Sequence, residues 1–276
     1  MEGEIVHETQ AAYEGGQGST LVLLHGLGGS WHIWKPVLAA LGKRHRVVAL
    51  TLPGHWGGPP LPDGVEPSVQ AIADALVQDL AARGIDRPHV CGNSLGGWLS
   101  LELVRRGKVR SATALSPAGG WTTPEDYQKI AKPFRLVFAL ITVLIVLSAL
   151  FLRFAFVRRL LNKQAMEHGD RVPAAEFKGA LNAIRNTKMM PRLLTNMGNV
   201  GALQPLDVGD TPVMIAWGER DQVIPFDTYG RPMLAKVSGA DNMMMPGVGH
   251  VPMYDDPKQI VDIILKTTAR AETPVT

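Results

Sequence analysis

The stretch "CGNSLGG", residues 91–97, decides the fold of this chain because it contains the pattern G-x-S-x-G centred on Ser94. The residues before it, "RPHVCGNS" (87–94), are typical of a buried strand, and residues 95–107 have helical spacing. In so tight a turn from strand to helix, small neighbours avoid clashes and the serine oxygen stands exposed above the sheet. The pattern predicts a nucleophilic serine; the alternative is a glycine-rich turn with an inert serine.

Strands and helices alternate outward from this turn in both directions. The alternation predicts an α/β fold, in which a mostly parallel sheet of about eight strands is covered by helices on both faces. Apolar runs indicate strands at residues 19–26, 46–55, 87–94, 110–117, 211–218 and 240–247. Helical periodicity indicates helices at residues 34–45, 67–84, 95–107, 226–236 and 257–269.

Residues 121–206 interrupt the alternation, since they contain no clear strand and read as several helices with polar joints. We expect them to form a helical cap, or lid, inserted between two strands of the sheet. The core is then divided into residues 1–120 and 207–270, and the tail 271–276 is expected to be disordered.

Two further residues follow predicted strands and complete a catalytic set with Ser94. A serine hydroxyl is a poor nucleophile unless a base takes its proton. His250 lies in "PGVGHVPMYDDP" and Asp221 in "WGERDQVIP", each just after a strand. Strand ends at one edge of a parallel sheet converge, so both side chains can meet above Ser94. Glu219 is an alternative to Asp221.

The chain resembles serine hydrolases of the α/β-hydrolase fold. The similarity runs from "LVLLHGLGGS" through "GNSLGG" and "WGERDQVIP" to "GVGHVPM", in the order Ser94, Asp221, His250 that is expected of this fold. The resemblance implies an oxyanion hole formed by the backbone N–H groups of Leu95 and Leu27, with Gly28 as the alternative to Leu27. It implies no cofactor and no metal.

Several nearby residues have structural interpretations instead. We expect His25 to hold the oxyanion loop and His55 to organise the loop after its strand. Cys91 is interpreted as a small packing group that would be a nucleophile only if Ser94 were not one. The substrate pocket is predicted to involve Gly28, Trp121, Leu140, Leu144 and Val251.

Serine at position 94 favours acyl transfer and argues against the epoxide hydrolases and haloalkane dehalogenases of this fold, which use an aspartate there. We therefore predict an esterase or lipase-like enzyme. One alternative is C–C bond hydrolysis of meta-cleavage products, although Val251 stands where those enzymes typically carry a tryptophan. For that chemistry Arg185 would be the cap arginine. A catalytically silent binding protein on the same fold is the other alternative.

An apolar stretch within the predicted cap, residues 134–161, raises the question of a membrane span. The seventeen residues from Leu136 to Leu152 carry no charge. They would reach about 26 Å as a helix, against the roughly 30 Å of a bilayer core. A single span would put Ser94 and His250 on opposite sides of a membrane, so we predict a cap helix and a lipophilic ester substrate. The basic flanks of the stretch, which also permit a lid in the membrane interface, are Lys129, Lys132, Arg135, Arg153, Arg158 and Arg159.

Composition narrows the remaining function classes. The 276 residues are 46% hydrophobic and 19% charged, with a formal net charge of only +3. So weak and scattered a charge, without a recognisable motif, argues against a nucleic-acid partner. The single cysteine permits no disulfide within the chain, and "MEGEIVHETQ" has no signal-peptide pattern. We expect a cytoplasmic monomer or homodimer, with peripheral membrane contact through the cap as the alternative.

Overall fold

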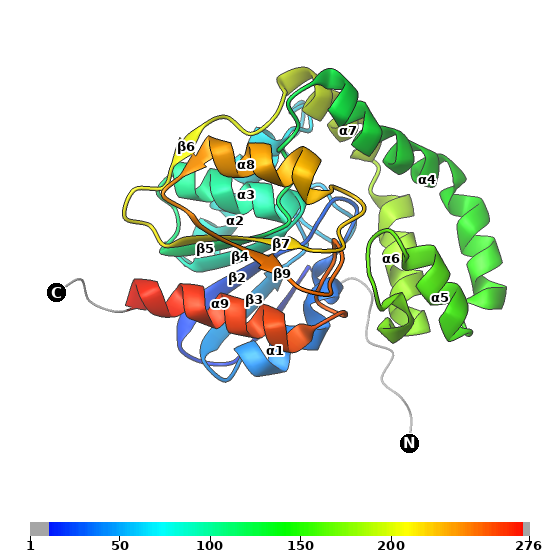
Figure 1. Cartoon of the computed structure of the whole chain (residues 1–276), viewed down its shortest axis with the longest axis horizontal. Coiled ribbons are helices and arrows are strands. Elements are labelled where there is room, and N and C mark those ends of the chain that lie inside the picture. The colour runs from blue at the N-terminus through cyan, green and yellow to red at the C-terminus, as the bar shows by residue number, and fades with distance from the viewer. Residues whose placement is uncertain (1–10, 273–276) are drawn as a thin grey trace.

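The computed structural model describes residues 11–272, except for the side chains of residues 147–150. Within that range a seven-stranded sheet has the order β1-β3-β2-β4-β5-β7-β9 (Figure 1). Six of its strands are parallel, and β1 pairs antiparallel with β3 at one edge. The strands are β1 (Ala12–Gly15), β2 (Ser19–Leu24), β3 (His45–Leu50), β4 (His89–Asn93), β5 (Ser111–Leu115), β7 (Val213–Gly218) and β9 (Asp241–Met245).

The α/β class and the mostly parallel sheet are confirmed, with seven strands in place of about eight. The edge strand β1, "AYEG", was not predicted because its four mixed residues give no apolar run. Two further residue pairs, β6 (Leu206–Asp207) and β8 (Val237–Ser238), form a separate small parallel sheet.

Both faces of the sheet are buried, which explains why its central strands β2, β4 and β5 are mostly apolar. In β2, Val22 and Leu24 face one core cluster while Leu21 and Leu23 face the other. Helices α2 (Val69–Ala82), α3 (Leu95–Arg105) and α8 (Arg231–Lys236) cover the first face, and α1 (Lys35–Leu41) and α9 (Pro257–Glu272) cover the second (Figure 1).

The ends of these helices follow local sequence signals. Ser68 caps α2, since its hydroxyl accepts a hydrogen bond from the backbone N–H of Ala71 at 3.0 Å. Gly84, at φ 66°, follows the same helix. The expected tail is corrected at its start, because α9 includes Ala271 and Glu272; residues 273–276 lie outside the described part, as do residues 1–10.

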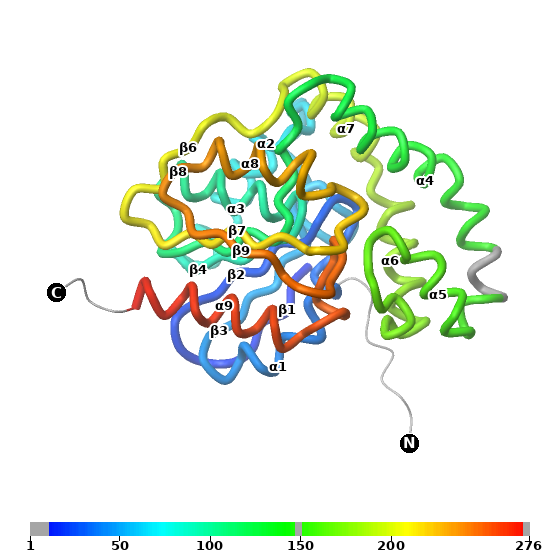
Figure 2. Tube along the Cα trace, viewed as in Figure 1, coloured from blue at the N-terminus to red at the C-terminus, as the bar shows by residue number. Residues whose placement is uncertain are grey.

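Residues 121–206 carry helices alone, apart from the start of β6 at Leu206. They are α4 (Pro124–Phe151), α5 (Ala155–Asn162), α6 (Ala174–Asn186) and α7 (Met190–Val200), with a short 3-10 turn at Gly169–Arg171. The trace in Figure 2 shows these helices beside the sheet, with α4 and α5 on the outside. No helix among the described residues has the length and apolar character that crossing a bilayer requires.

Candidate active site

Ser94 occupies a strained turn between β4 and α3. Its backbone has φ 56° and ψ −114°, a conformation that costs on the order of 1–3 kcal/mol in a residue other than glycine. The flanking glycines are required by space: a Cβ on Gly92 would lie 2.0 Å from the carbonyl oxygen of Gly96. A Cβ on Gly96 would lie 2.1 Å from the carbonyl oxygen of Leu24. The local geometry is therefore that of a serine held at the sheet edge.

Asp221 and His250 meet in the loops that follow β7 and β9. The Nδ1 atom of His250 lies 2.8 Å from Oδ2 of Asp221, and both residues are buried. The other oxygen of Asp221 accepts the backbone N–H groups of Val223 at 3.0 Å and Ile224 at 2.9 Å. Because a carboxylate accepts, Nδ1 of His250 carries the proton and Nε2 is left with the free lone pair.

Asn93 joins the serine turn to the histidine loop, a role that the sequence did not suggest. Its amide Nδ2 donates to the carbonyl oxygen of His250 at 2.8 Å and to that of Leu115 at 3.1 Å. On the other side, a Cβ on Gly26 would lie 3.2 Å from Cβ of Ser94, so the loop after β2 also reaches the serine. The structure thus brings three predicted loops to one edge of the sheet.

The loop after β2 is a tight turn in which Gly29 N–H donates to the carbonyl oxygen of Gly26 at 3.1 Å. Gly28 has φ 73°, the left-handed conformation that glycine permits. Leu27 lies within this turn, while Leu95 is the first residue of α3, so its N–H lacks an acceptor within the helix. The assignment of Leu27 and Leu95 as oxyanion donors stays a prediction.

His25 fixes this loop as a neutral imidazole. Its Nε2 accepts the backbone N–H of Leu52 at 2.9 Å, so Nδ1 carries the proton and donates to the carbonyl oxygen of Gly26 at 2.7 Å. Burial, with a smaller contribution from nearby His55, lowers the pKa of His25 well below its usual value. Burial likewise lowers the pKa of His55 to about 4. The expected loop-holding role of His25 agrees with these contacts.

Helices α6 and α7 cover the loops at the serine edge. A Cβ on Gly28 would lie 2.5 Å from Cε of Met190 and 3.2 Å from Cγ1 of Ile184. The next loop, after β3, touches the same segment: a Cβ on Gly54 would lie 2.3 Å from the sulfur of Met189. The hydroxyl of Thr187 accepts the backbone N–H of Trp56 at 3.2 Å. Apolar side chains from the insertion therefore cover the predicted oxyanion loop.

The other predicted pocket residues have mixed positions. Trp121 was predicted as a pocket wall. It is instead buried in the main core, where its ring centroid lies 5.3 Å from that of Trp98. Leu140 also differs from the prediction of a pocket residue, because it is 46% exposed on α4. Leu144 is half-buried on the same helix. Val251 is half-buried, and its backbone N–H donates to the carbonyl oxygen of Ala165 in the insertion at 2.8 Å.

Asp255 is the residue that sequence reasoning missed most clearly. Its buried carboxylate accepts the N–H of Gly249, next to His250, at 2.9 Å. The same carboxylate accepts the N–H groups of Glu167 at 3.0 Å and His168 at 2.7 Å. One side chain thereby ties the histidine loop to the insertion. The only local signal was its place in "PMYDDP", which does not distinguish it from Asp256.

We expect Asp255→Asn to lower the free energy of unfolding by about 1–3 kcal/mol, because an amide has one acceptor oxygen for three N–H donors. Hydrogen exchange should accelerate at residues 167, 168 and 249. Asp256→Asn is the matched control, since the side chain of Asp256 accepts the N–H of Gln259 at 2.9 Å, and asparagine can accept the same bond. Equal effects of the two substitutions in thermal unfolding would contradict this assignment.

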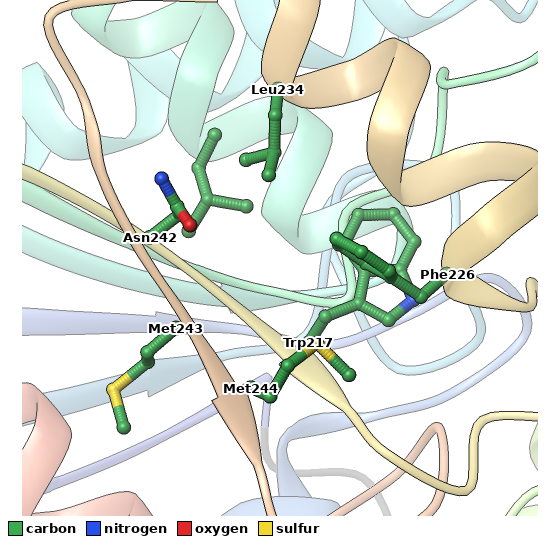
Figure 3. Close-up of a pocket in the computed structure, with 7 residues that line it drawn as sticks. Trp217, Phe226, Leu234, Asn242, Met243 and Met244 are labelled. Atoms are coloured by element: carbon green, nitrogen blue, oxygen red, sulfur yellow. The ribbon is translucent and has the colours of Figure 1, made fainter.

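A separate cavity lies away from the three converging loops, between β7, β9 and the α8 region (Figure 3). Its volume is about 40 Å³, which suits water rather than a substrate. Trp217, Phe226, Leu234 and Met244 contribute apolar surface, and Asn242 is its polar side chain. This cavity carries no part of the predicted site.

Comparison with known proteins gives consistent matches over most of the chain. A model described as "Alpha/beta hydrolase family" matches residues 21–263. Epoxide hydrolase EphH of Mycobacterium tuberculosis is 32% identical over 200 residues, which cover 71% of this chain and 93% of that protein. Pimeloyl-(acyl-carrier protein) methyl ester esterase of Aeromonas hydrophila is 27% identical over 264 residues, covering 90% and 95%.

Among solved structures, a thermophilic esterase from Thermogutta terrifontis superposes with a TM-score of 0.72. The match covers 95% of this chain and 94% of the esterase at 18% sequence identity. At that identity the likeness shows a shared fold alone.

Proposed function

The chain belongs to the alpha/beta hydrolase family, and on that basis we propose that it is a serine hydrolase of carboxylic esters whose acyl or aryl part is lipophilic. The observation that carries the proposal is the buried His250–Asp221 pair, tied through Asn93 to the strained turn of Ser94. A base with an orienting carboxylate beside a half-buried serine is an arrangement that suits acyl transfer.

In the proposed reaction, Oγ of Ser94 attacks the ester carbonyl carbon while Nε2 of His250 takes its proton. Asp221 holds the imidazole in the required tautomer and stabilises the imidazolium. The backbone N–H groups of Leu27 and Leu95 bind the developing oxyanion; losing one such donor typically costs about 10²–10³ in rate. His250 then protonates the leaving alcohol, and water activated by the same histidine hydrolyses the acyl-enzyme.

The proposal of a lipophilic substrate rests on the apolar side chains that cover the site. Ile184, Met189 and Met190 place apolar groups over the loops at Gly28 and Gly54. Buried apolar surface favours apolar ligands by about 25 cal/mol per Å². The inference thus rests on the inner helices α6 and α7, in place of the α4 residues that the sequence suggested.

Epoxide hydrolysis, the activity named for one relative, is disfavoured by the residue at position 94. In this fold that chemistry uses an aspartate as nucleophile, and this chain has a serine there. The C–C hydrolase alternative gains no support either, because Arg185 is exposed on α6 and Val251 replaces the tryptophan typical of those enzymes.

A panel of p-nitrophenyl esters from short to long acyl chains tests the proposal. We expect hydrolysis, with kcat/KM rising toward longer chains because the site's cover is apolar. A panel of aryl epoxides assayed beside it should give no turnover. Epoxide turnover without ester hydrolysis, or failure of the folded protein to react with a fluorophosphonate, would overturn the proposed ester chemistry.

A further inference from the structure

The outer helix α4 leaves a large apolar surface uncovered. Among its described side chains, Tyr127 and Ala131 in the first half enter the main core, and Ile141 is buried farther along. Large exposed apolar patches on a protein mark interaction or membrane surfaces. On α4 the large exposed apolar side chains lie mostly three or four residues apart, at Leu136, Val137, Leu140, Val143 and Val146.

Helix α5 and the turn before it continue this feature. No residue of α5 is buried, and two of its large apolar side chains, Phe156 and Leu160, are 70% and 69% exposed. The ring centroid of Phe156 lies 5.8 Å from that of Phe154, which is itself exposed, so these side chains pack on no buried core within the described chain. Together with the α4 residues, they form what we call the α4–α5 apolar surface, and its second part is Phe151, Phe154, Phe156, Leu160 and Leu161.

The segment that carries this surface has charge of one sign, and its acidic partners lie outside it: Lys129 pairs with Asp126 at 2.9 Å, and Arg159 lies 3.9 Å from Asp170. Residues 127–166 contain seven of the 28 Lys and Arg residues and none of the 25 Asp and Glu residues. The rest of the chain therefore carries 21 basic residues against 25 acidic ones, so the positive charge of the protein is concentrated here. Six of the seven are exposed, namely Lys129, Lys132, Arg135, Arg153, Arg159 and Lys163, and Arg158 is half-buried.

Six of these seven basic side chains face solvent. A partner of this surface should therefore carry negative charge. We propose that the α4–α5 apolar surface docks into the headgroup region of a membrane that contains anionic lipid. Apolar side chains enter the boundary between headgroups and acyl chains, and Lys and Arg residues contact the anionic headgroups. A second copy of the chain fits less well, because a two-fold interface would bring the same positive charges against each other.

The fold permits this docking without dividing the active site. Strands β5 and β7, which flank the insertion in sequence, are paired neighbours in the sheet, with Ala112 opposite Val213. Both ends of the insertion therefore lie on one side of the docked membrane. Helix α4 packs against α6, whose Ile184 covers the loop at Gly28. The docking surface and the cover of the serine site are thus opposite sides of the same helical layer.

Flotation of the full-length protein with lipid vesicles tests the proposal independently of catalysis. Vesicles of phosphatidylcholine with phosphatidylglycerol should bind the protein, and vesicles of phosphatidylcholine alone should bind it much less. The double variant Phe156→Ser/Leu160→Ser should lower the partition coefficient at least about tenfold. Lys132→Gln/Lys163→Gln should lower it about 25-fold, because each basic residue near an anionic surface contributes roughly fivefold.

Matched controls separate docking from general effects of substitution. Val200→Ser changes an exposed apolar residue on α7, and Lys266→Gln changes an exposed basic residue on α9; neither should alter binding. Equal binding to both vesicle types, or unchanged binding of both double variants, would overturn the proposal. The proposal would also be overturned if the wild-type protein bound neither vesicle type and formed a dimer that Phe156→Ser/Leu160→Ser dissociates. A second copy of the chain would then cover the surface.

Discussion

Ser94→Ala is expected to lower kcat for ester hydrolysis by a factor on the order of 10⁵–10⁶, because alanine has no oxygen to form the acyl-enzyme. Labelling by a fluorophosphonate should disappear entirely. Thermal unfolding should change little, since no hydrogen bond of the Ser94 side chain holds the fold together within the described residues and the backbone strain at φ 56° remains. Residual turnover would come from the oxyanion donors and from substrate binding.

Cys91→Ala is the matched control, because Cys91 is the other potential nucleophile and lies in β4, the strand that leads to Ser94. Its thiol is fully buried, and burial raises its pKa well above the usual value, so it stays protonated. We expect kcat to stay within a few-fold of the wild-type value. Loss of labelling in Cys91→Ala but not in Ser94→Ala would reverse the assignment of the nucleophile.

The local features of the site could be predicted because each depends on a few adjacent residues. Gly92 and Gly96 are needed where a Cβ has no room, and the strand before Ser94 is buried because both sheet faces are covered. Asp221 and His250 follow strands whose apolar runs are plain in the sequence. The convergence of those loops then follows from the parallel sheet.

The contacts that hold the site together could not be predicted in the same way. Asn93 reaches across 157 positions of sequence to the carbonyl oxygen of His250, and Asp255 reaches 88 positions to the N–H of Glu167. Nothing in the neighbourhood of either residue distinguishes it from other polar residues. Such hydrogen bonds depend on how the insertion lies against the sheet, which no local pattern encodes.

The apolar stretch shows a different reason for an incomplete prediction. Hydrophobicity indicates that a surface prefers not to face water, but it does not say what covers that surface. The sequence suggested that Leu140 lines a pocket, whereas Leu140 is exposed and the serine edge is covered by Met189 and Met190. The exposed apolar side chains of α4 are the reason why we propose a membrane as the partner of this helix.

Asp221→Asn is expected to lower kcat about 10⁴-fold while leaving KM nearly unchanged. The amide of asparagine can donate to Nδ1 of His250, which would move the imidazole proton to Nε2. The histidine could then no longer take the proton of Ser94. Because Val223 and Ile224 still find an acceptor oxygen, the loop should keep its geometry, and thermal unfolding should shift by only a few degrees.

Glu219→Gln is the control that distinguishes the two acidic residues of this loop. Glu219 accepts the N–H of Gly247 at 2.8 Å, and its side chain is exposed, so its substitution should alter kcat less than threefold. A large loss with Glu219→Gln and little with Asp221→Asn would exchange their roles. The double variant Ser94→Ala/Asp221→Asn gives a further test: residues that act as one unit are not additive, so it should be no slower than Ser94→Ala alone. Additive losses would mean that Asp221 acts on the substrate independently of Ser94.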